Sequence, residues 1–246
     1  YDSFDYERIL FTNAGYKLEI FPGGRHDHKG KMEFSKDAVG LMIRSTEIND
    51  EFLQELTQLK AIVRYGVGYD NIDLDAANRF NVKVSNVQGY ANHSVSDHAI
   101  AMIYSCARAL SLGQKLIREK HGSPPIKEII EFHNKTLGII GLGQIGGTLC
   151  RKVRPLFKKI LACDPYISNE RFKKLGAEES SLENLLRNSD VISIHCNLTD
   201  ETTNLINEVT IKLMDKNPIL INTARGPVIN EDDLFEESQD KPIENI

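Results

Sequence analysis

Short apolar runs alternate along this chain with longer segments in which apolar residues recur at helical spacing. The apolar runs lie at roughly 17–21, 38–43, 61–65, 82–84, 137–141, 160–163, 191–194 and 219–221. The segments of helical spacing lie at 4–13, 50–59, 94–120, 145–156, 182–188 and 208–214. Runs that are apolar at nearly every position indicate strands buried on both faces, and amphipathic helices between them can cover those faces. The pattern therefore predicts an α/β fold class with doubly wound parallel sheets.

Two polar residues stand where predicted helices begin. Asn49 precedes the helix over 50–59, and Ser181 precedes the helix over 182–188. An Asn or Ser side chain in this position accepts a hydrogen bond from a first-turn amide. We therefore expect Asn49 and Ser181 to act as N-caps.

The longest helical segment, 94–120, separates two groups of predicted strands. It is followed by a Gly-Ser-Pro-Pro sequence at 122–125, which cannot continue a helix. We expect two domains, one over 1–97 and one over 98–246; the motifs below bear on which of them binds substrate and which binds a cofactor. The chain opens on a helical segment and not on a strand, so the first domain is expected to be incomplete, with a strand upstream.

The composition excludes several classes of protein. Of 246 residues, 41% are hydrophobic and 26% are charged, which argues against disorder. The net charge of −5 disfavours nucleic-acid binding, because phosphate binding needs clustered positive charge. No apolar run reaches ten residues, so no membrane span is expected.

The cysteines bear on metal binding and on location. The chain has four of them, Cys106, Cys150, Cys163 and Cys196. None belongs to a C-x-x-C pair or a zinc-finger pattern, and we expect no metal site. Unpaired cysteines in apolar stretches fit a reducing compartment, so a cytoplasmic location is expected.

A glycine-rich turn stands between an apolar run and a helical segment. Gly141, Gly143 and Gly146 have the G-x-G-x-x-G spacing of dinucleotide-binding folds. The first glycine permits a tight turn, the second lets the backbone approach a pyrophosphate, and the third lets the helix pack closely on the strand. The amides of Gln144 and Ile145 would then point at the anion. The alternative is a tight strand-to-helix turn that binds no ligand.

Asp164 ends the next apolar run, 23 residues after Gly141. A carboxylate at this position can accept hydrogen bonds from the adenine ribose and would repel a 2′-phosphate. Alone, Asp164 could equally be a turn-forming residue before Pro165. With the glycines at the right distance, it favours NAD as the cofactor over NADP.

Three further segments narrow the family. They are RYGVGYDNID at 64–73, VISIHCNLTDETTNLI at 191–206 and INTARGPVIN at 221–230. With the glycine turn, in this order, they resemble the D-isomer-specific 2-hydroxyacid dehydrogenases, which include phosphoglycerate, glycerate, D-lactate and formate dehydrogenases and the C-terminal-binding-protein corepressors. The resemblance implies a Rossmann NAD domain inserted into a flavodoxin-like substrate domain. It also implies an active site in the cleft between these two domains, and a homodimer formed through the long helix at 94–120.

The resemblance also implies substrate-binding residues. Val67 and Gly68 belong to a Gly-x-Gly turn whose backbone amides can hold the substrate carboxylate; an ordinary glycine turn is the alternative. Tyr65 is expected to face the substrate pocket. Arg225 follows an apolar run, at the end of the sheet where ligands bind in such folds. Its guanidinium is expected to be catalytic, because it can bind the substrate carboxylate and polarise the adjacent carbonyl.

Other residues are given lesser roles. Cys196, Thr223 and Ala224 are expected to lie along the cofactor by the same resemblance. His195 is expected to line the cleft without serving as the acid. The basic residues at 152, 154, 158 and 159 are expected to form a solvated face.

The resemblance implies a Glu and a proton-transferring His well beyond Arg225. Only 21 residues follow Arg225, and neither partner is assigned among them. The segment after Arg225 begins like a helix and continues like a later loop. We therefore expect a break in the chain between Leu234 and Phe235; the alternative is a truncated chain.

The favoured hypothesis is an NAD-dependent dehydrogenase acting on a small D-2-hydroxy acid or 2-keto acid. The alternative is an NAD(H)-sensing binding protein of the corepressor type without significant turnover. A formate dehydrogenase is a third hypothesis. The identity of the 2-hydroxy acid is not readable from these residues.

Overall fold

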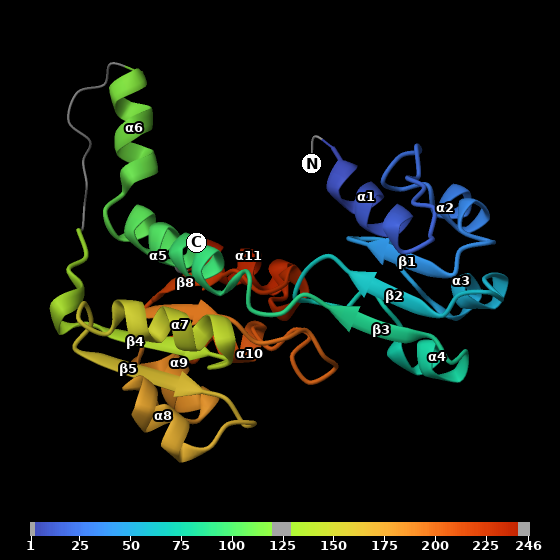
Figure 1. Ribbon diagram of the computed structural model, residues 1–246. Coiled ribbons are helices and arrows are strands. Elements are labelled where there is room, and N and C mark those ends of the chain that lie inside the picture. Colours follow the sequence, from blue (N-terminus) through green and yellow to red (C-terminus); the bar gives the residue numbers. More distant parts are fainter. Residues whose placement is uncertain (1–2, 120–128, 241–246) are drawn as a thin grey trace. The chain divides into compact units, whose positions relative to one another are not determined.

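The structure is a computed structural model that describes residues 3–119 and 129–240. The chain divides into two compact units, Tyr1–Val87 and Gln88–Ile246, each described below by itself (Figure 1). The boundary lies N-terminal to the predicted one at 97/98. The reason is that α5 (Asn92–Ala107) buries Ala99, Ile103 and Ala107 in the core of the second unit.

The first unit is a small parallel α/β layer. Its elements are α1 (Asp5–Asn13), α2 (His28–Phe34), β1 (Gly40–Ile43), α3 (Asp50–Glu55), β2 (Ala61–Arg64), α4 (Leu74–Arg79) and β3 (Lys83–Asn86). The strands pair in the order β1-β2-β3, all parallel. The core gathers around Ile62, which is fully buried, with Phe52 and Leu53 from α3 and Ala76 from α4.

The predicted strand at 17–21 is wrong. These residues follow α1 as irregular chain without strand pairing. Lys17 and Glu19 pair with each other at 2.7 Å, and both side chains are exposed. A strand is stable only when a neighbour satisfies its backbone groups, and hydrophobicity at three positions does not supply that neighbour.

The second unit contains the larger sheet. Its elements are α5, α6 (Leu110–Arg118), η1 (Phe132–Asn134), β4 (Thr136–Ile140), α7 (Gln144–Val153), β5 (Lys159–Cys163), α8 (Asn169–Leu175), β6 (Glu178–Glu179), α9 (Leu182–Asn188), β7 (Val191–Ile194), α10 (Glu208–Ile211), β8 (Ile219–Asn222), η2 (Gly226–Val228) and α11 (Glu231–Asp240).

The five strands of this unit are parallel, in the order β6-β5-β4-β7-β8. The chain moves outward from β4 to β6 and then returns to β7 on the other side of β4. The carboxyl end of β4 is therefore the switch point of the strand order, which is where ligands bind in doubly wound sheets. The α/β fold class with parallel sheets is thereby confirmed.

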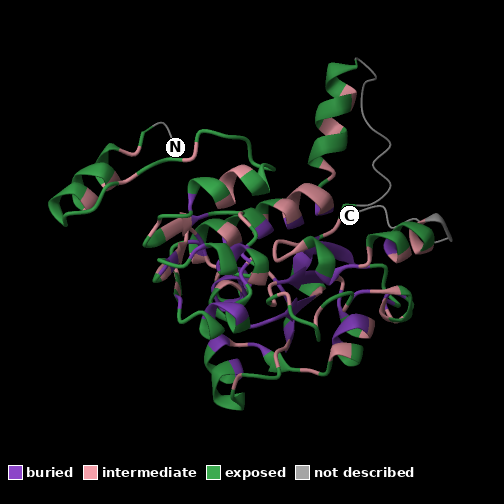
Figure 2. Ribbon diagram, turned by 90° about the vertical axis from the view of Figure 1, so that its right-hand side faces the viewer, coloured by how far each residue is buried: buried purple, intermediate pink, exposed green. Residues whose placement is uncertain are grey.

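Helices cover both faces of this sheet. Ile139 belongs to one core, together with Ile103 of α5 and Leu149 of α7. Its neighbour Ile140 belongs to the opposite core, together with Leu185 of α9. Figure 2 shows the buried residues concentrated along the strands and the inward faces of these helices. Burial on both faces explains why the strands are apolar at almost every position.

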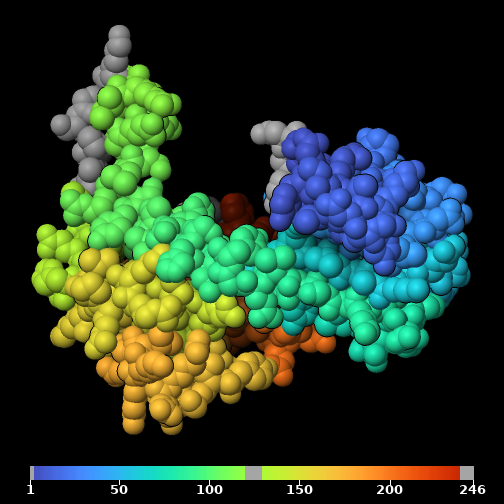
Figure 3. All heavy atoms as spheres, viewed as in Figure 1, coloured from blue at the N-terminus to red at the C-terminus, as the bar shows by residue number. Residues whose placement is uncertain are grey.

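The predicted helix over 94–120 is two helices. Ala109 has φ +49, which a continuous right-handed helix does not allow, so α5 ends at Ala107 and α6 begins at Leu110. None of the residues of α6 is buried. Within its unit, α6 extends away from the sheet (Figures 1 and 3).

Several local predictions can be compared with the structure. Asn49 accepts a hydrogen bond from the Phe52 amide at 2.9 Å, and Ser181 accepts one from the Asn184 amide at 3.2 Å, so both N-caps are confirmed. The expected break between Leu234 and Phe235 is wrong, because α11 runs through both residues and Leu234 packs into the core.

The solvated basic face is wrong at Lys152. Its ammonium donates to the Ser96 hydroxyl at 2.8 Å, the His93 carbonyl at 3.1 Å and the Asp97 carboxylate at 2.6 Å. Lys152 therefore fastens α7 to the start of α5. Across the described residues, no helix is long and apolar enough to cross a bilayer.

Candidate functional site

The turn from β4 to α7 requires glycine at two positions. Gly141 has φ +87, and a Cβ there would lie 2.6 Å from the Cys196 amide nitrogen. A Cβ on Gly146 would overlap the carbonyl oxygen of Gly141. A side chain at Gly141 would therefore push the turn away from the loop after β7, and one at Gly146 would push α7 away from β4.

Gly143, in contrast, is not constrained by packing within the protein. No described heavy atom lies within 4 Å of the position that its Cβ would take. It is the N-cap of α7, and having no side chain it leaves the first-turn amides uncapped. The amides of Gln144 and Ile145 therefore face an open approach at the positive end of a ten-residue helix. This is a cradle that fits a pyrophosphate.

Asp164 is held at the carboxyl end of β5. Its carboxylate accepts from the Leu142 amide at 2.8 Å and from the Tyr166 amide at 3.0 Å. It therefore fixes the glycine turn and forms a local turn at the same time. Each oxygen keeps a second lone pair for a ribose hydroxyl. Beside it lies an open hollow lined by Cys163, Asp164, Pro165, Glu179, Ser180 and Ser181.

His195 joins the ends of β7 and β8. Its Nε2 lies 2.8 Å from the Ser193 hydroxyl, and its Nδ1 lies 3.3 Å from the Thr223 hydroxyl. Burial lowers the pKa of His195 to about 4, so the ring is neutral near pH 7. A neutral ring fixed by two hydroxyls is suited to orienting Thr223.

Arg225 lies on the loop after β8. Its Nη1 donates to the Ala224 carbonyl at 2.8 Å. Asn222 organises this loop, since its amide group donates to the Arg225 carbonyl at 2.8 Å and accepts from the Ala224 amide at 3.0 Å. Sequence reasoning missed Asn222; the available signal was a polar amide directly after a buried strand.

The predicted cofactor residues gather at one edge of the second unit. Gly141, Gly143, Gln144, Ile145, Gly146, Asp164, Cys196, Thr223 and Ala224 all lie at or just beyond the carboxyl ends of β4, β5, β7 and β8. Cys196 is in direct backbone contact with the Gly141 turn, and burial raises the pKa of its thiol.

The predicted substrate residues of the first unit lie at the carboxyl end of β2. Gly66 has φ +149, and the amide of Asn86 donates to the Val67 carbonyl at 2.6 Å. The hydrogen bond from Asn86 fixes the backbone of the turn at Val67, next to Gly68. The Tyr65 hydroxyl lies 3.3 Å from the Glu7 carboxylate of α1 and donates to it.

Arg64 is a second residue that sequence reasoning missed. Its Nη1 donates to the Tyr65 carbonyl at 3.0 Å, and its guanidinium lies against Gly66. Among the described residues, its buried Nε has no hydrogen-bond partner. A guanidinium beside a glycine turn with one donor unsatisfied is a candidate group for binding an anion.

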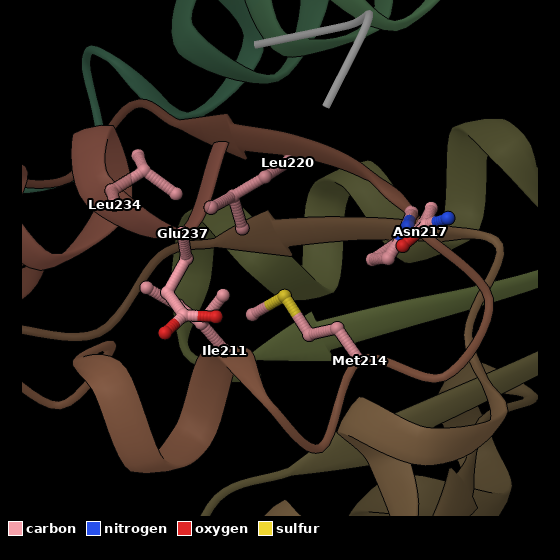
Figure 4. Close-up of a pocket in the computed structure, with 7 residues that line it drawn as sticks. Ile211, Met214, Asn217, Leu220, Leu234 and Glu237 are labelled. Atoms are coloured by element: carbon pink, nitrogen blue, oxygen red, sulfur yellow. The ribbon is translucent and has the colours of Figure 1, made fainter. Parts of the chain in front are cut away.

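Two other features do not contribute to these sites. A small apolar cavity lies beneath α11, lined by Ile211, Met214, Asn217, Pro218, Leu220, Leu234 and Glu237 (Figure 4). Within residues 3–119 and 129–240, no three His, Cys, Asp or Glu side chains gather as ligands for a metal.

The chain has relatives among known proteins. Residues 100–246 match the NAD-binding domain model of the D-isomer specific 2-hydroxyacid dehydrogenases. A D-3-phosphoglycerate dehydrogenase of Bacillus subtilis is 36% identical over 197 residues, which are 80% of this chain and 38% of that protein. A 2-hydroxyacid dehydrogenase homolog of Zymomonas mobilis is 34% identical over 232 residues, 93% of this chain and 70% of that protein.

A solved structure agrees with these matches. D-lactate dehydrogenase from Aquifex aeolicus, complexed with NAD and lactic acid, superposes with a TM-score of 0.79 at 32% identity. The alignment covers 85% of this chain and 63% of that one. These relatives are dehydrogenases and give no support to the corepressor hypothesis. The chain belongs to the D-isomer specific 2-hydroxyacid dehydrogenase family, and its second unit is the NAD-binding domain of that family.

Proposed function

We propose that this chain belongs to an NAD-dependent dehydrogenase that transfers a hydride between NAD(H) and a small D-2-hydroxy acid or 2-keto acid. The observation that carries the proposal is the cradle at Gly143, open to a ligand and flanked by the carboxylate of Asp164. NAD, when bound, supplies the hydride-accepting ring. The protein contributes binding, orientation and electrostatics.

In the second unit, the amides of Gln144 and Ile145 bind the pyrophosphate in this proposal. Asp164 accepts from the ribose hydroxyls and rejects a 2′-phosphate. Cys196, Thr223 and Ala224 line the path of the cofactor along the carboxyl edge of the sheet. The support is their common location beyond strands that are adjacent in the sheet.

Arg225 is the proposed catalytic residue of this unit. A guanidinium binds a carboxylate through two parallel hydrogen bonds and polarises a neighbouring carbonyl. The hydrogen bonds of Asn222 stiffen the backbone that carries it. In the first unit, the amides of Val67 and Gly68 are proposed to hold the substrate carboxylate, with Tyr65 and Arg64 beside them.

His195 is not proposed as the proton donor. With a pKa of about 4, it carries almost no proton to donate near pH 7. The proton-transferring pair that the family resemblance implies is not assigned to residues of this sequence.

Two further proposals concern assembly and location. The apolar side chains of Leu110, Leu112 and Ile117 on α6 are 58%, 43% and 75% exposed, and we propose that they pack against a second copy of the chain. The four cysteines lie in described residues and form no disulfide, which supports the proposed cytoplasmic location.

The test of the function is NADH oxidation by the full-length protein with a panel of 2-keto acids that differ in size and charge. We expect turnover with at least one of them. Arg225→Ala should lower kcat/KM by more than about 100-fold, because it removes both the anchor and the polarising charge. Tight NADH binding without turnover on any acid would contradict the enzyme assignment, and full kcat/KM in Arg225→Ala would contradict the role of Arg225.

A further inference from the structure

The glycine turn carries no positive side chain of its own. Residues 141–147 read Gly-Leu-Gly-Gln-Ile-Gly-Gly. The side chain of Gln144 is engaged elsewhere, accepting from the amide of Asn92 at 3.1 Å. The dipole of α7 offers only about half an elementary charge, whereas a pyrophosphate diester carries two negative charges. A cation at this turn would therefore add substantially to cofactor binding.

Arg171 brings a guanidinium to this place. Its Nη2 lies 3.5 Å from the carbonyl oxygen of Gly143, the residue at which α7 begins. The guanidinium thus contacts the residue at the start of the cradle and leaves the space over Gly143 open. Arginine presents five donors in a planar fork, and four remain for a ligand when one points at Gly143.

The backbone beneath Arg171 is held firmly. Phe172 and Leu175 of α8 are 2% and 5% exposed. The Leu175 side chain packs so closely on α7 that a Cβ on Gly147 would lie 3.3 Å from it. Arg171 thus has a fixed origin and an exposed, adaptable side chain, which is the combination expected of a residue that closes on a ligand.

We propose that Arg171 binds the pyrophosphate of the dinucleotide. The segment from β5 to α8 then serves both halves of the adenosine diphosphate: Asp164 takes the ribose and Arg171 takes the phosphates. The pyrophosphate is favoured over a 2′-phosphate because the guanidinium contacts Gly143, whereas the ribose side is occupied by the carboxylate of Asp164. The proposal rests on the NAD-binding role of the turn.

The test compares Arg171→Gln with the unaltered protein, each titrated with NADH, NADPH, ADP-ribose and adenosine. Lys173→Gln is the matched control, since it removes the same charge from the same short helix at another exposed position. For Arg171→Gln we expect Kd to rise roughly three- to tenfold for both NADH and ADP-ribose and to stay unchanged for adenosine. The affinity of the variant for NADH should also depend less on ionic strength.

Each other outcome overturns the inference. Equal NADH affinity in Arg171→Gln and the unaltered protein would exclude a contact between Arg171 and the pyrophosphate. An equal loss for adenosine would show that the substitution disturbs the turn or the ribose site, and a loss confined to NADPH would place Arg171 at the 2′-position. Absence of NADH binding by the unaltered chain would instead overturn the proposed function, and this inference with it.

Discussion

Gly141 and Gly143 lie two residues apart in one turn, yet the structure constrains them in different ways. Gly141 has a backbone conformation that L-residues rarely adopt and is closed in by the backbone of Cys196. Gly143 has φ −65 and open space around it. Backbone strain therefore explains the first glycine, and for the second we propose access of the pyrophosphate.

This difference predicts a split between stability and binding. Gly141→Ala should lower the free energy of unfolding by about 2 kcal/mol, because it combines a positive φ with a backbone clash. Gly143→Ala should unfold at the same urea concentration as the parent but bind NADH at least about tenfold more weakly, because its methyl group would meet the pyrophosphate. Unchanged NADH affinity in a stable Gly143→Ala would contradict the cradle.

Asp164 is the residue that should set the choice of cofactor. Asp164→Asn keeps an acceptor for the Leu142 amide and removes the charge. We expect the ratio of the NADPH and NADH dissociation constants to fall by about tenfold, since repulsion of the 2′-phosphate is lost. Fluorescence titration with both cofactors measures this ratio. An unchanged ratio would mean that Asp164 is only a turn residue.

His195 should make the protein sensitive to acid. Its pKa is about 4 in the folded chain and about 6.5 in a free side chain. As the pH falls, the unfolded state therefore binds a proton at His195 before the folded state does. Stability should therefore fall as the pH drops from about 6.5 to about 4. The measurement is urea unfolding against pH for the parent and for His195→Gln, whose side chain keeps hydrogen-bonding capacity. The parent should lose more stability than the variant over this range; parallel curves would contradict the lowered pKa.

At the scale of elements, α6 differs from every helix that packs on the larger sheet. It begins after the left-handed Ala109, and none of its residues is buried. Apolar side chains at helical spacing on a helix without a buried face need another partner.

If that partner is a second copy, Ile117→Glu should shift the chain from dimer toward monomer. Gln114→Glu is the control, because it adds the same charge to the same helix at an exposed polar position. Sedimentation velocity across a range of concentrations gives the result. A dimer of equal affinity in Ile117→Glu, or a monomeric parent, would remove α6 from the account of assembly.

Elements could be predicted where local pattern and packing agree. β4, β5, β7 and β8 are buried on both faces, and their apolar runs mark them. β6 could not be found, because it consists of Glu178 and Glu179 at the sheet edge and depends on pairing with β5. The end of α5 was missed as well, because alanine favours a helix and the sequence therefore gives no sign that Ala109 has φ +49.

At the scale of the whole molecule, the candidate site also divides into features set by local sequence and features set by tertiary packing. The conformation of the glycine turn and the position of Asp164 after β5 could be predicted, because strand, turn and helix are contiguous there. The surroundings of Asn222, Arg64 and Arg171 could not be predicted, because they depend on where a side chain reaches after folding. The observed boundary at 87/88 differs from the predicted one at 97/98 for a related reason, because α5 packs on the second unit and so belongs to it.

The most direct test of the account is a calorimetric titration of NADH, and separately of NADPH, into the full chain. We expect saturable binding of one NADH per chain, at least about tenfold tighter than NADPH, because in the proposed complex Asp164 contacts the ribose and the open N-terminus of α7 binds the pyrophosphate. No saturable NADH binding, or NADPH binding as tight as NADH, would contradict it.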